Sequence, residues 1–251
     1  MIRRVLAVLA VTLVTGACAS GPGDQPAQVA DNYPEPVFSA ERLLPADFVS
    51  PTEVNDPWQG MNRRIYAFNY RFDYYVFLPV VRGYRAVVPQ VARRGVGNFF
   101  ENFRDMRSAV NSVLQLNPEK FFQSTGRVLL NSTVGLFGLI DVATMADIPK
   151  PDEDFGQTLG YWGVDQGPYL VIPLLGPSNL RDGVGMLPDF YMQTVFQDEL
   201  LAKPLRATVF LFDSIDTRYD TSFRYYETGS AFEYDMVRFL WSTKRELDVA
   251  K

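Results

Sequence analysis

Apolar side chains recur every three or four residues over residues 58–75, and this spacing predicts an amphipathic helix. The stripe consists of Trp58, Met61, Ile65, Phe68, Phe72 and Tyr75. Asp56 is a candidate N-cap, because Pro57 after it suits the first helical position. Tyrosines at four-residue spacing lie beside arginines on the other side, and both residue types suit a membrane interface. An aromatic stripe is also typical of an ordinary core, so both interpretations stay open.

The same periodicity predicts helices over residues 90–115 and 117–131 and another near the C-terminus. Asn117 followed by proline marks the start of the second of these helices. Ser230 and Glu233 have the spacing of a capping box, which would begin the last helix. The chain contains no internal repeat. These patterns predict a mostly α-helical fold.

Two stretches break the helical pattern. Residues 134–140 are apolar and contain Gly135 and Gly138, which permit close approach of backbone segments. Residues 155–180 carry one charged residue, Asp165, among glycines, prolines and apolar side chains. Because loops are usually polar, this second stretch is expected to contact something other than water.

Residues 169–172 have the composition of a strand. A turn over residues 163–167 would pair this strand with residues 158–162 as a β-hairpin. Side chains alternate along a strand, so Tyr169 and Val171 share one face while Leu170 and Ile172 share the other. Both faces are apolar. The residues assigned to this hairpin are Gly160, Tyr161, Trp162, Tyr169, Leu170, Val171, Ile172 and Pro173.

The N-terminal residues have the order of a secretory signal peptide. Two arginines precede an apolar run of ten residues, and small residues then lead to Cys18, the only cysteine. This order resembles a bacterial lipobox, whose cysteine is acylated after the leader is removed, and Ala19 favours sorting to the outer membrane. We expect a signal peptide over residues 1–17, an acylated Cys18 with a flexible tether over 18–50, and one helical domain over 51–251. Ordinary cleavage that leaves a free thiol is the alternative.

The residue inventory restricts the chemistry. The chain has no histidine, so nucleophiles activated by histidine are excluded and zinc sites lose a common ligand. The phosphate-binding pattern G-x-x-x-x-G-K-[ST] is absent. A net charge of −5 disfavours nucleic acid as a partner. Residues 152–154 are acidic but lack the spacing of an EF-hand, which favours a solvated loop. We expect no cofactor, no metal site and no catalytic residue, although a Ser-Lys or carboxylate mechanism stays open.

Five groups of residues, in this order, resemble the MlaA (VacJ) family of outer-membrane lipoproteins over about residues 51–248. The first three are Asn55-Asp56-Pro57 with Asn62-Arg63 and Phe68-Asn69; Val88-Pro89-Gln90 with Arg93 and Asn98-Phe99; and Asn131-Ser132-Thr133 with Gly135, Gly138 and Asp141-Val142-Ala143. The last two are residues 155–160, and Gly167-Pro168-Tyr169 with Pro173, Gly176-Pro177-Ser178 and Arg181-Asp182. The C-terminal third matches more loosely.

The resemblance implies a ring-like bundle of amphipathic helices embedded in the periplasmic leaflet of the outer membrane. A central amphipathic channel, bordered by the hairpin, would take mislocalised phospholipid from the outer leaflet and so maintain lipid asymmetry. The implied partners are phospholipids, an outer-membrane porin trimer and a periplasmic lipid carrier similar to MlaC that feeds an inner-membrane ABC transporter.

The resemblance also suggests roles for particular segments. We hypothesise that one face of the hairpin packs on the ring and the other borders the phospholipid path. Asn62, Arg63, Phe68 and Asn69 belong to the first helix, and Gly135, Gly138 and Asp141 to the close-packed segment. Candidates for contacting a headgroup are Arg63, Arg71, Lys203 and Arg206, which the sequence does not rank. The alternatives are an envelope scaffold or porin accessory that transports nothing, and a histidine-free lipid-modifying enzyme.

Overall fold

The computed structural model describes residues 54–200 and 206–251, so the predicted signal peptide, Cys18 and the tether lie outside the described residues. Within those residues the chain is mostly helical and contains one small antiparallel sheet. The elements in chain order are α2 (Gln59–Phe72), η1 (Asp73–Phe77), α3 (Leu78–Val87), α4 (Gln90–Leu114), α5 (Pro118–Thr133), α6 (Val142–Met145), α7 (Phe155–Tyr161), β1 (Tyr169–Ile172), β2 (Gly176–Asn179), α8 (Leu180–Leu200), α9 (Arg206–Asp220) and α10 (Glu233–Ala250). The predicted fold class, a mostly α bundle with one short hairpin, is confirmed.

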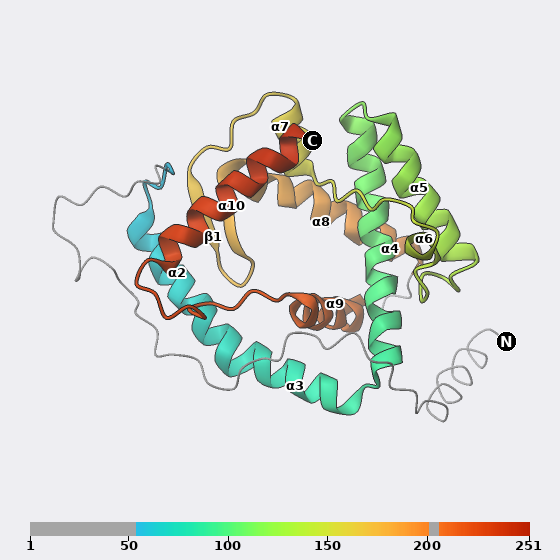
Figure 1. Cartoon of the computed structure of the whole chain (residues 1–251), viewed down its shortest axis with the longest axis horizontal. Coiled ribbons are helices and arrows are strands. Elements are labelled where there is room, and N and C mark those ends of the chain that lie inside the picture. The colour runs from blue at the N-terminus through green and yellow to red at the C-terminus, as the bar shows by residue number, and fades with distance from the viewer. Residues whose placement is uncertain (1–53, 201–205) are drawn as a thin grey trace.

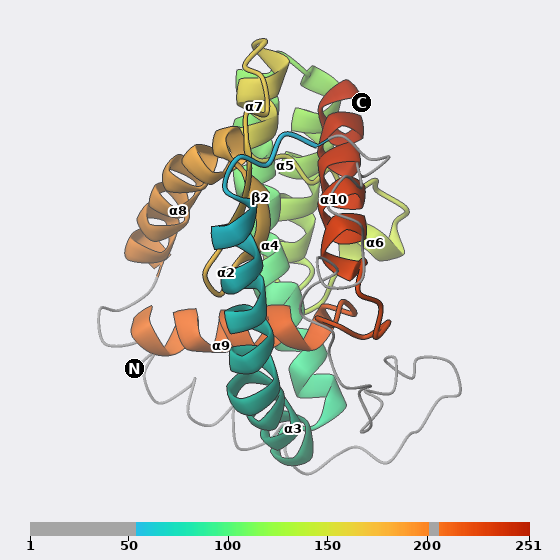
Figure 2. The same cartoon turned by 90° about the vertical axis from the view of Figure 1, so that its left-hand side faces the viewer.

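The helices are arranged as a ring (Figure 1). α2, η1 and α3 continue into one another along one side of the ring, and α4 forms another side with α5 packed against it. α8 and α10 lie across the ring from α3. α9 packs against α3 and α4 (Figure 2). The β1–β2 hairpin lies among α2, α8 and α10, because β1 contacts α2 and α8 while β2 contacts α8 and α10.

Prolines and a side-chain cap set several helix boundaries. η1 is a turn of π-helix just before Pro79, and this wider turn gives the proline ring room that a regular helix would deny it. α3 ends at Val87, and Val88 after it has the extended backbone favoured before proline. The side chain of Asn117 accepts a hydrogen bond from the Lys120 backbone N–H and caps α5, as predicted.

Two predicted caps are wrong. α2 begins at Gln59, and the Asp56 carboxylate instead accepts hydrogen bonds from Asn62, Tyr234 and Arg238. α10 begins at Glu233, whose buried carboxylate accepts from the Tyr66 hydroxyl and from the backbone of residues 226 and 228. In both cases the carboxylate bonds a donor from a distant segment, Tyr234 for Asp56 and Tyr66 for Glu233, so it is not available to a local helix terminus.

The predicted pairing of residues 158–162 with β1 is also wrong. Residues 158–161 belong to helix α7 and Trp162 is its C-cap, while Asp154 caps the start of the helix by accepting from the Gln157 N–H. Gly163, at φ +85°, ends the helix in a Schellman-type turn, in which the Val164 N–H bonds the Leu159 carbonyl. β1 instead pairs with β2, in the register Tyr169 to Asn179. Gly160, Tyr161 and Trp162 are therefore not hairpin residues.

Candidate functional site

The polarity of the ring is reversed relative to a water-soluble core. Among the described residues, buried polar and charged side chains outnumber buried apolar ones. α2 buries Asn62, Tyr66 and Asn69, whereas Phe68 of the predicted apolar stripe is 48% exposed. Apolar side chains with more than half of their surface exposed include Tyr75, Val87, Val91, Phe122, Leu129, Phe137, Met145, Leu187, Phe190 and Tyr191. Apolar surface this extensive marks contact with a membrane or a protein partner.

The buried centre near the hairpin is aromatic and hydrogen-bonded. Tyr66 makes edge-to-face contacts with Tyr226 and Tyr234, at centroid distances of 5.2 and 5.7 Å. Its hydroxyl donates to Glu233 at 3.0 Å. Burial and the adjacent Glu233 carboxylate raise the pKa of Tyr66 well above its usual range, so the hydroxyl stays a donor. Tyr169 and Val171 of β1 belong to this same cluster.

An open apolar groove lies on the other face of β1. Its volume is about 470 Å³, and its walls come from α2, β1 and the first half of α8. The lining residues are Met61, Ile65, Leu170, Val171, Ile172, Pro173, Leu180, Gly183, Val184 and Leu187. Leu170 and Ile172 are half-buried in the groove wall, whereas the side chains of Tyr169 and Val171 are fully buried in the core, although Val171 also borders the groove. The alternation predicted from the sequence therefore separates a core face from a groove face.

Asn62 and Asn69 attach β1 to α2. The Asn62 amide donates to the Tyr169 carbonyl at 3.1 Å and accepts from the Val171 N–H at 2.9 Å. The Asn69 amide donates to the Ile172 carbonyl at 3.0 Å and accepts from the Leu174 N–H at 2.8 Å. Both asparagines are buried. The structure thus brings two residues of the first helix together with the hairpin.

Other predicted site residues lie away from the groove or are engaged in ion pairs. Arg63 pairs with Asp235 at 2.9 Å, and its guanidinium lies 4.3 Å from the centre of the aromatic ring of Tyr234. The charge of Arg63 is therefore neutralised by an ion pair within the protein. Tyr161 and Trp162 are exposed on α7 and its cap, and the Trp162 Nε1–H donates to the Leu114 carbonyl at 3.0 Å. Among the other headgroup candidates, the Arg71 side chain is exposed, Lys203 lies outside the described residues, and Arg206 begins α9.

The segment after α5 is closely packed. A Cβ atom at Gly135 would collide with the Ile140 carbonyl oxygen, and one at Gly138, where φ is +87°, would lie 3.1 Å from Cβ of Asn102. Asp141 caps α6 and pairs with Arg127 at 3.1 Å. This segment joins α4, α5 and α6 and is not part of the groove.

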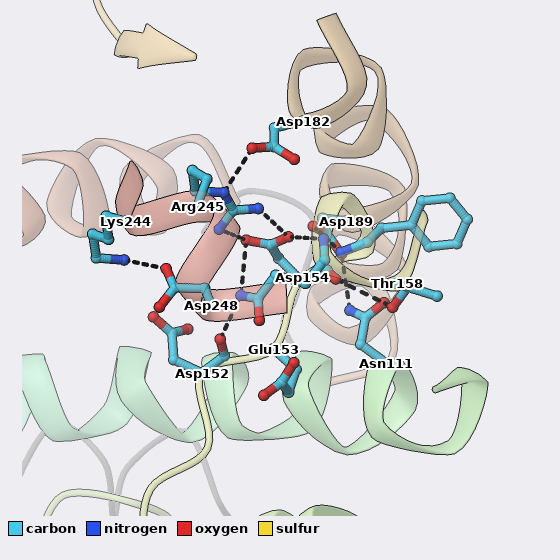
Figure 3. A network of polar contacts seen from close by, with 12 residues as sticks. Asn111, Asp152, Glu153, Asp154, Thr158, Asp182, Asp189, Lys244, Arg245 and Asp248 are labelled. Atoms are coloured by element: carbon cyan, nitrogen blue, oxygen red, sulfur yellow. Dashed lines mark hydrogen bonds and ion pairs between the residues drawn. The ribbon is translucent and has the colours of Figure 1, made fainter. Parts of the chain in front are cut away.

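Charged groups to which the sequence assigned no structural role hold the other side of the ring (Figure 3). They include Asp154, for which the prediction of a solvated loop is wrong. Arg245 of α10 pairs with Asp154 at the start of α7, at 2.8 Å, and with Asp182 of α8, at 2.6 Å. Burial would raise the pKa of Asp154, but the hydrogen-bonded guanidinium outweighs it and holds that pKa below its usual range. The spacing of Asp154 and Gln157 is that of a capping box, which could have revealed α7.

Metal chemistry has no candidate in the described part of the chain, where no group of three acidic or cysteine side chains could hold an ion. None of the described helices combines the length and the apolar composition needed to cross a membrane.

Comparison with known proteins identifies the family. The family model for the MlaA lipoprotein matches residues 54–248. The chain belongs to the MlaA lipoprotein family. The Intermembrane phospholipid transport system lipoprotein MlaA of Escherichia coli (strain K12) is 37% identical over 169 residues, which cover 65% of this chain and 66% of that protein. An uncharacterized protein of Rickettsia felis is 41% identical over 130 residues, or 52% of each chain.

A solved structure has the same architecture. It comes from work on the structural basis for maintenance of bacterial outer membrane lipid asymmetry. The TM-score is 0.64 at 33% sequence identity, covering 77% of this chain and 98% of the other. The resemblance to the MlaA family that the residue groups indicate is thereby confirmed. The chain spans about half the length of the Rickettsia relatives and about two thirds of the Escherichia coli MlaA protein.

Proposed function

We propose that this protein is an outer-membrane lipoprotein that removes mislocalised phospholipid from the outer leaflet and passes it to a periplasmic carrier, thereby maintaining lipid asymmetry. Membership of the MlaA family supports this proposal, as do the names of the relatives. The porin trimer, the MlaC-like carrier and the inner-membrane ABC transporter are proposed as partners on the family relationship alone.

The observation that carries the proposal is the reversed polarity of the ring. Apolar side chains such as Phe137, which is 81% exposed, would be costly in water but are compatible with acyl chains. The buried polar groups are compatible with a polar interior, because they are hydrogen-bonded or paired there. We therefore place the ring in the periplasmic leaflet, with acyl chains at its outer surface.

The groove is the proposed contact for a lipid tail. All of its lining side chains are apolar, so it offers no headgroup ligand, nucleophile or acid–base group. This composition favours passage of an acyl chain over chemistry on the ester, and we propose that the protein is not an enzyme.

Photo-crosslinking in cells tests this role of the groove. A photoreactive residue at Leu170 or Ile172 should capture phospholipid, whereas one at Tyr169 or Val171 should capture protein, because those two side chains lie in the core. A probe at Asp248 serves as the control. Failure of both groove positions to capture phospholipid, together with surface phospholipid that still rises on deletion, would favour the scaffold alternative.

The lipid anchor is tested separately. Cys18→Ala should leave a protein that still associates with membranes, because the exposed apolar helices are expected to hold it there, but that reaches the outer membrane poorly. Fractionation of inner and outer membranes measures this distribution. A fully soluble variant would contradict the proposed embedding.

A further inference from the structure

The edge of strand β1 that faces away from β2 is hydrogen-bonded to side chains of helix α2. β2 occupies one edge of β1. On the other edge, the Tyr169 N–H donates to the Asn55 carbonyl, and the Asn62 amide bonds the Tyr169 carbonyl and the Val171 N–H. The Asn69 amide bonds the Ile172 carbonyl and the N–H of Leu174, just beyond the strand. An exposed strand edge presents unpaired donors and acceptors, which are costly where water is absent. The two asparagines therefore take the place of a third strand.

The spacing of the two asparagines on α2 matches the distance between the backbone groups that they bond. Seven residues of α-helix amount to two turns and rise about 10.5 Å, so Asn62 and Asn69 project from the same side of α2. The pair of groups that Asn62 bonds begins at Tyr169, and the pair that Asn69 bonds begins at Ile172. These residues are three apart, which corresponds to about 10 Å of strand. The two lengths agree, so both amides reach their partners from a regular α2. Carbonyls three residues apart on a regular strand point to opposite edges, so the chain departs from regular strand geometry at the tip, where Leu174 has φ +67°.

Asparagine is suited to this task by its chemistry. Each pair of groups consists of one carbonyl and one N–H, and a primary amide supplies one donor and one acceptor on the same short side chain. Aspartate lacks the donor when ionised, and leucine has a similar shape but neither group. The pairing accordingly depends on the residue type as well as on its position.

The two asparagines hold different parts of the hairpin. Near Asn62, the side chains of Tyr169 and Val171 are packed among the buried tyrosines, which anchor the base of the hairpin. Near Asn69, Pro173, Leu174 and Leu175 are all exposed. The tip that carries Ile172 into the groove thus depends on Asn69 more than the base depends on Asn62.

We propose that Asn62 and Asn69 are positioning residues for the phospholipid path, and that Asn69 in particular keeps the hairpin tip closed against α2. This inference rests on the proposed function of the groove. Because the pairing uses side chains, the tip can leave α2 without unfolding any helix of the ring. Movement of Ile172 and Pro173 would widen the groove, and Asn69 would thereby control passage of lipid.

Hydrogen exchange of the purified full chain in detergent tests the pairing itself. Asn69→Leu should reduce the protection factor of the Leu174 amide about ten-fold or more, because its hydrogen-bond acceptor is lost, while protection within α4 stays unchanged. Asn131→Leu is the matched control, since Asn131 is also buried but bonds Asp141 and Ala143, away from the hairpin. It should lower overall stability without selective exposure of Leu174.

Asn69→Asp provides a readout that a merely space-filling role would not produce. A protonated carboxyl has one donor and one acceptor and reproduces the amide, whereas a carboxylate cannot donate. Either form of the carboxyl can accept from the Leu174 N–H, so protection of Leu174 should be largely retained in Asn69→Asp at acidic and neutral pH. The Asn69→Leu variant, which fills similar space but has no acceptor, should lose this protection at every pH. Equal Leu174 protection in wild type and Asn69→Leu would overturn the pairing.

Surface phospholipid in cells connects the pairing to the path. Strains carrying the wild type, the Asn69→Leu variant or no protein are compared at equal protein abundance. A surface level in the Asn69→Leu strain that differs from wild type supports the positioning role. A wild-type level, despite lost protection of Leu174, overturns it. If the deletion strain also has a normal level, the proposed function itself fails, and the two failures are thus distinguishable.

Discussion

Asp216 has an unusual environment for a carboxylate and leads to a quantitative prediction. It lies on α9 against α3 and α4 and is 1% exposed. One oxygen accepts from the Tyr84 hydroxyl at a long 3.5 Å, and the other has no hydrogen-bond partner in the described part of the chain. That second oxygen and one from Asp220 both lie within 4 Å of where Gly97 would carry a Cβ, so two carboxylates meet at the α4 backbone.

Burial, and then the negative charge of Asp220, raise the pKa of Asp216 to about 7, although Arg104 lowers it. The negative charge of Asp213 raises the pKa of Asp216 further, and the hydrogen bond from Tyr84 lowers it. At the neighbouring Asp220, burial and Glu101 raise the pKa of the carboxyl and Lys150 lowers it. In the unfolded chain the same carboxyl titrates near 3.8. Between these values the native state holds a proton that the unfolded state has lost, so stability falls as pH rises. At 1.36 kcal/mol per pKa unit, the loss by pH 7 is about 4 kcal/mol.

Thermal and urea unfolding of the detergent-solubilised protein from pH 4 to pH 8 measures this effect. Asp216→Asn should be close to wild type near pH 4 and more stable than wild type above pH 7, because the amide never ionises. Asp154→Asn is a control of opposite sign: its pKa is lowered by Arg245, so the variant should lose stability at neutral pH and approach wild type in acid. An Asp216→Asn difference that is constant with pH, or an Asp216 carboxyl that titrates near 4 by NMR, would refute the reasoning.

Three further variants test the packing of the ring. Gly183→Phe should fill the groove, because a Cβ there already lies 3.7 Å from Cδ1 of Ile172, and it should lower phospholipid crosslinking while Gly183→Ala does not. Gly138→Leu should destabilise the protein by about 1–3 kcal/mol in thermal unfolding, since it combines a positive φ with a tight contact to Asn102; unchanged stability would count against close packing. Arg127→Met should lower the free energy of unfolding by about 3–5 kcal/mol, because the fully buried guanidinium has two carboxylate partners that would be left unpaired, and neutralising one of them as well should recover part of the loss.

Local signals in the sequence determined most of the helices. Periodicity over residues 90–115 predicts α4 closely, and Asn117 with its proline predicts the start of α5, because capping and spacing act within one or two turns. The alternation along β1 likewise placed Tyr169 and Val171 on one face and Leu170 and Ile172 on the other. These features depend on neighbours along the chain and can be derived without knowing the fold.

The tertiary structure alone decided which face of each element is inside. Periodicity divides α2 into two faces but does not state which one is buried, and here Asn62 and Asn69 lie inside while Phe68 lies outside. The roles of Asp56 and Glu233 were decided in the same way, by donors far away in the sequence. The physical reason is that a hydrogen bond to a distant buried group, in a ring whose outer surface is apolar, outweighs the local preference of a cap or a stripe.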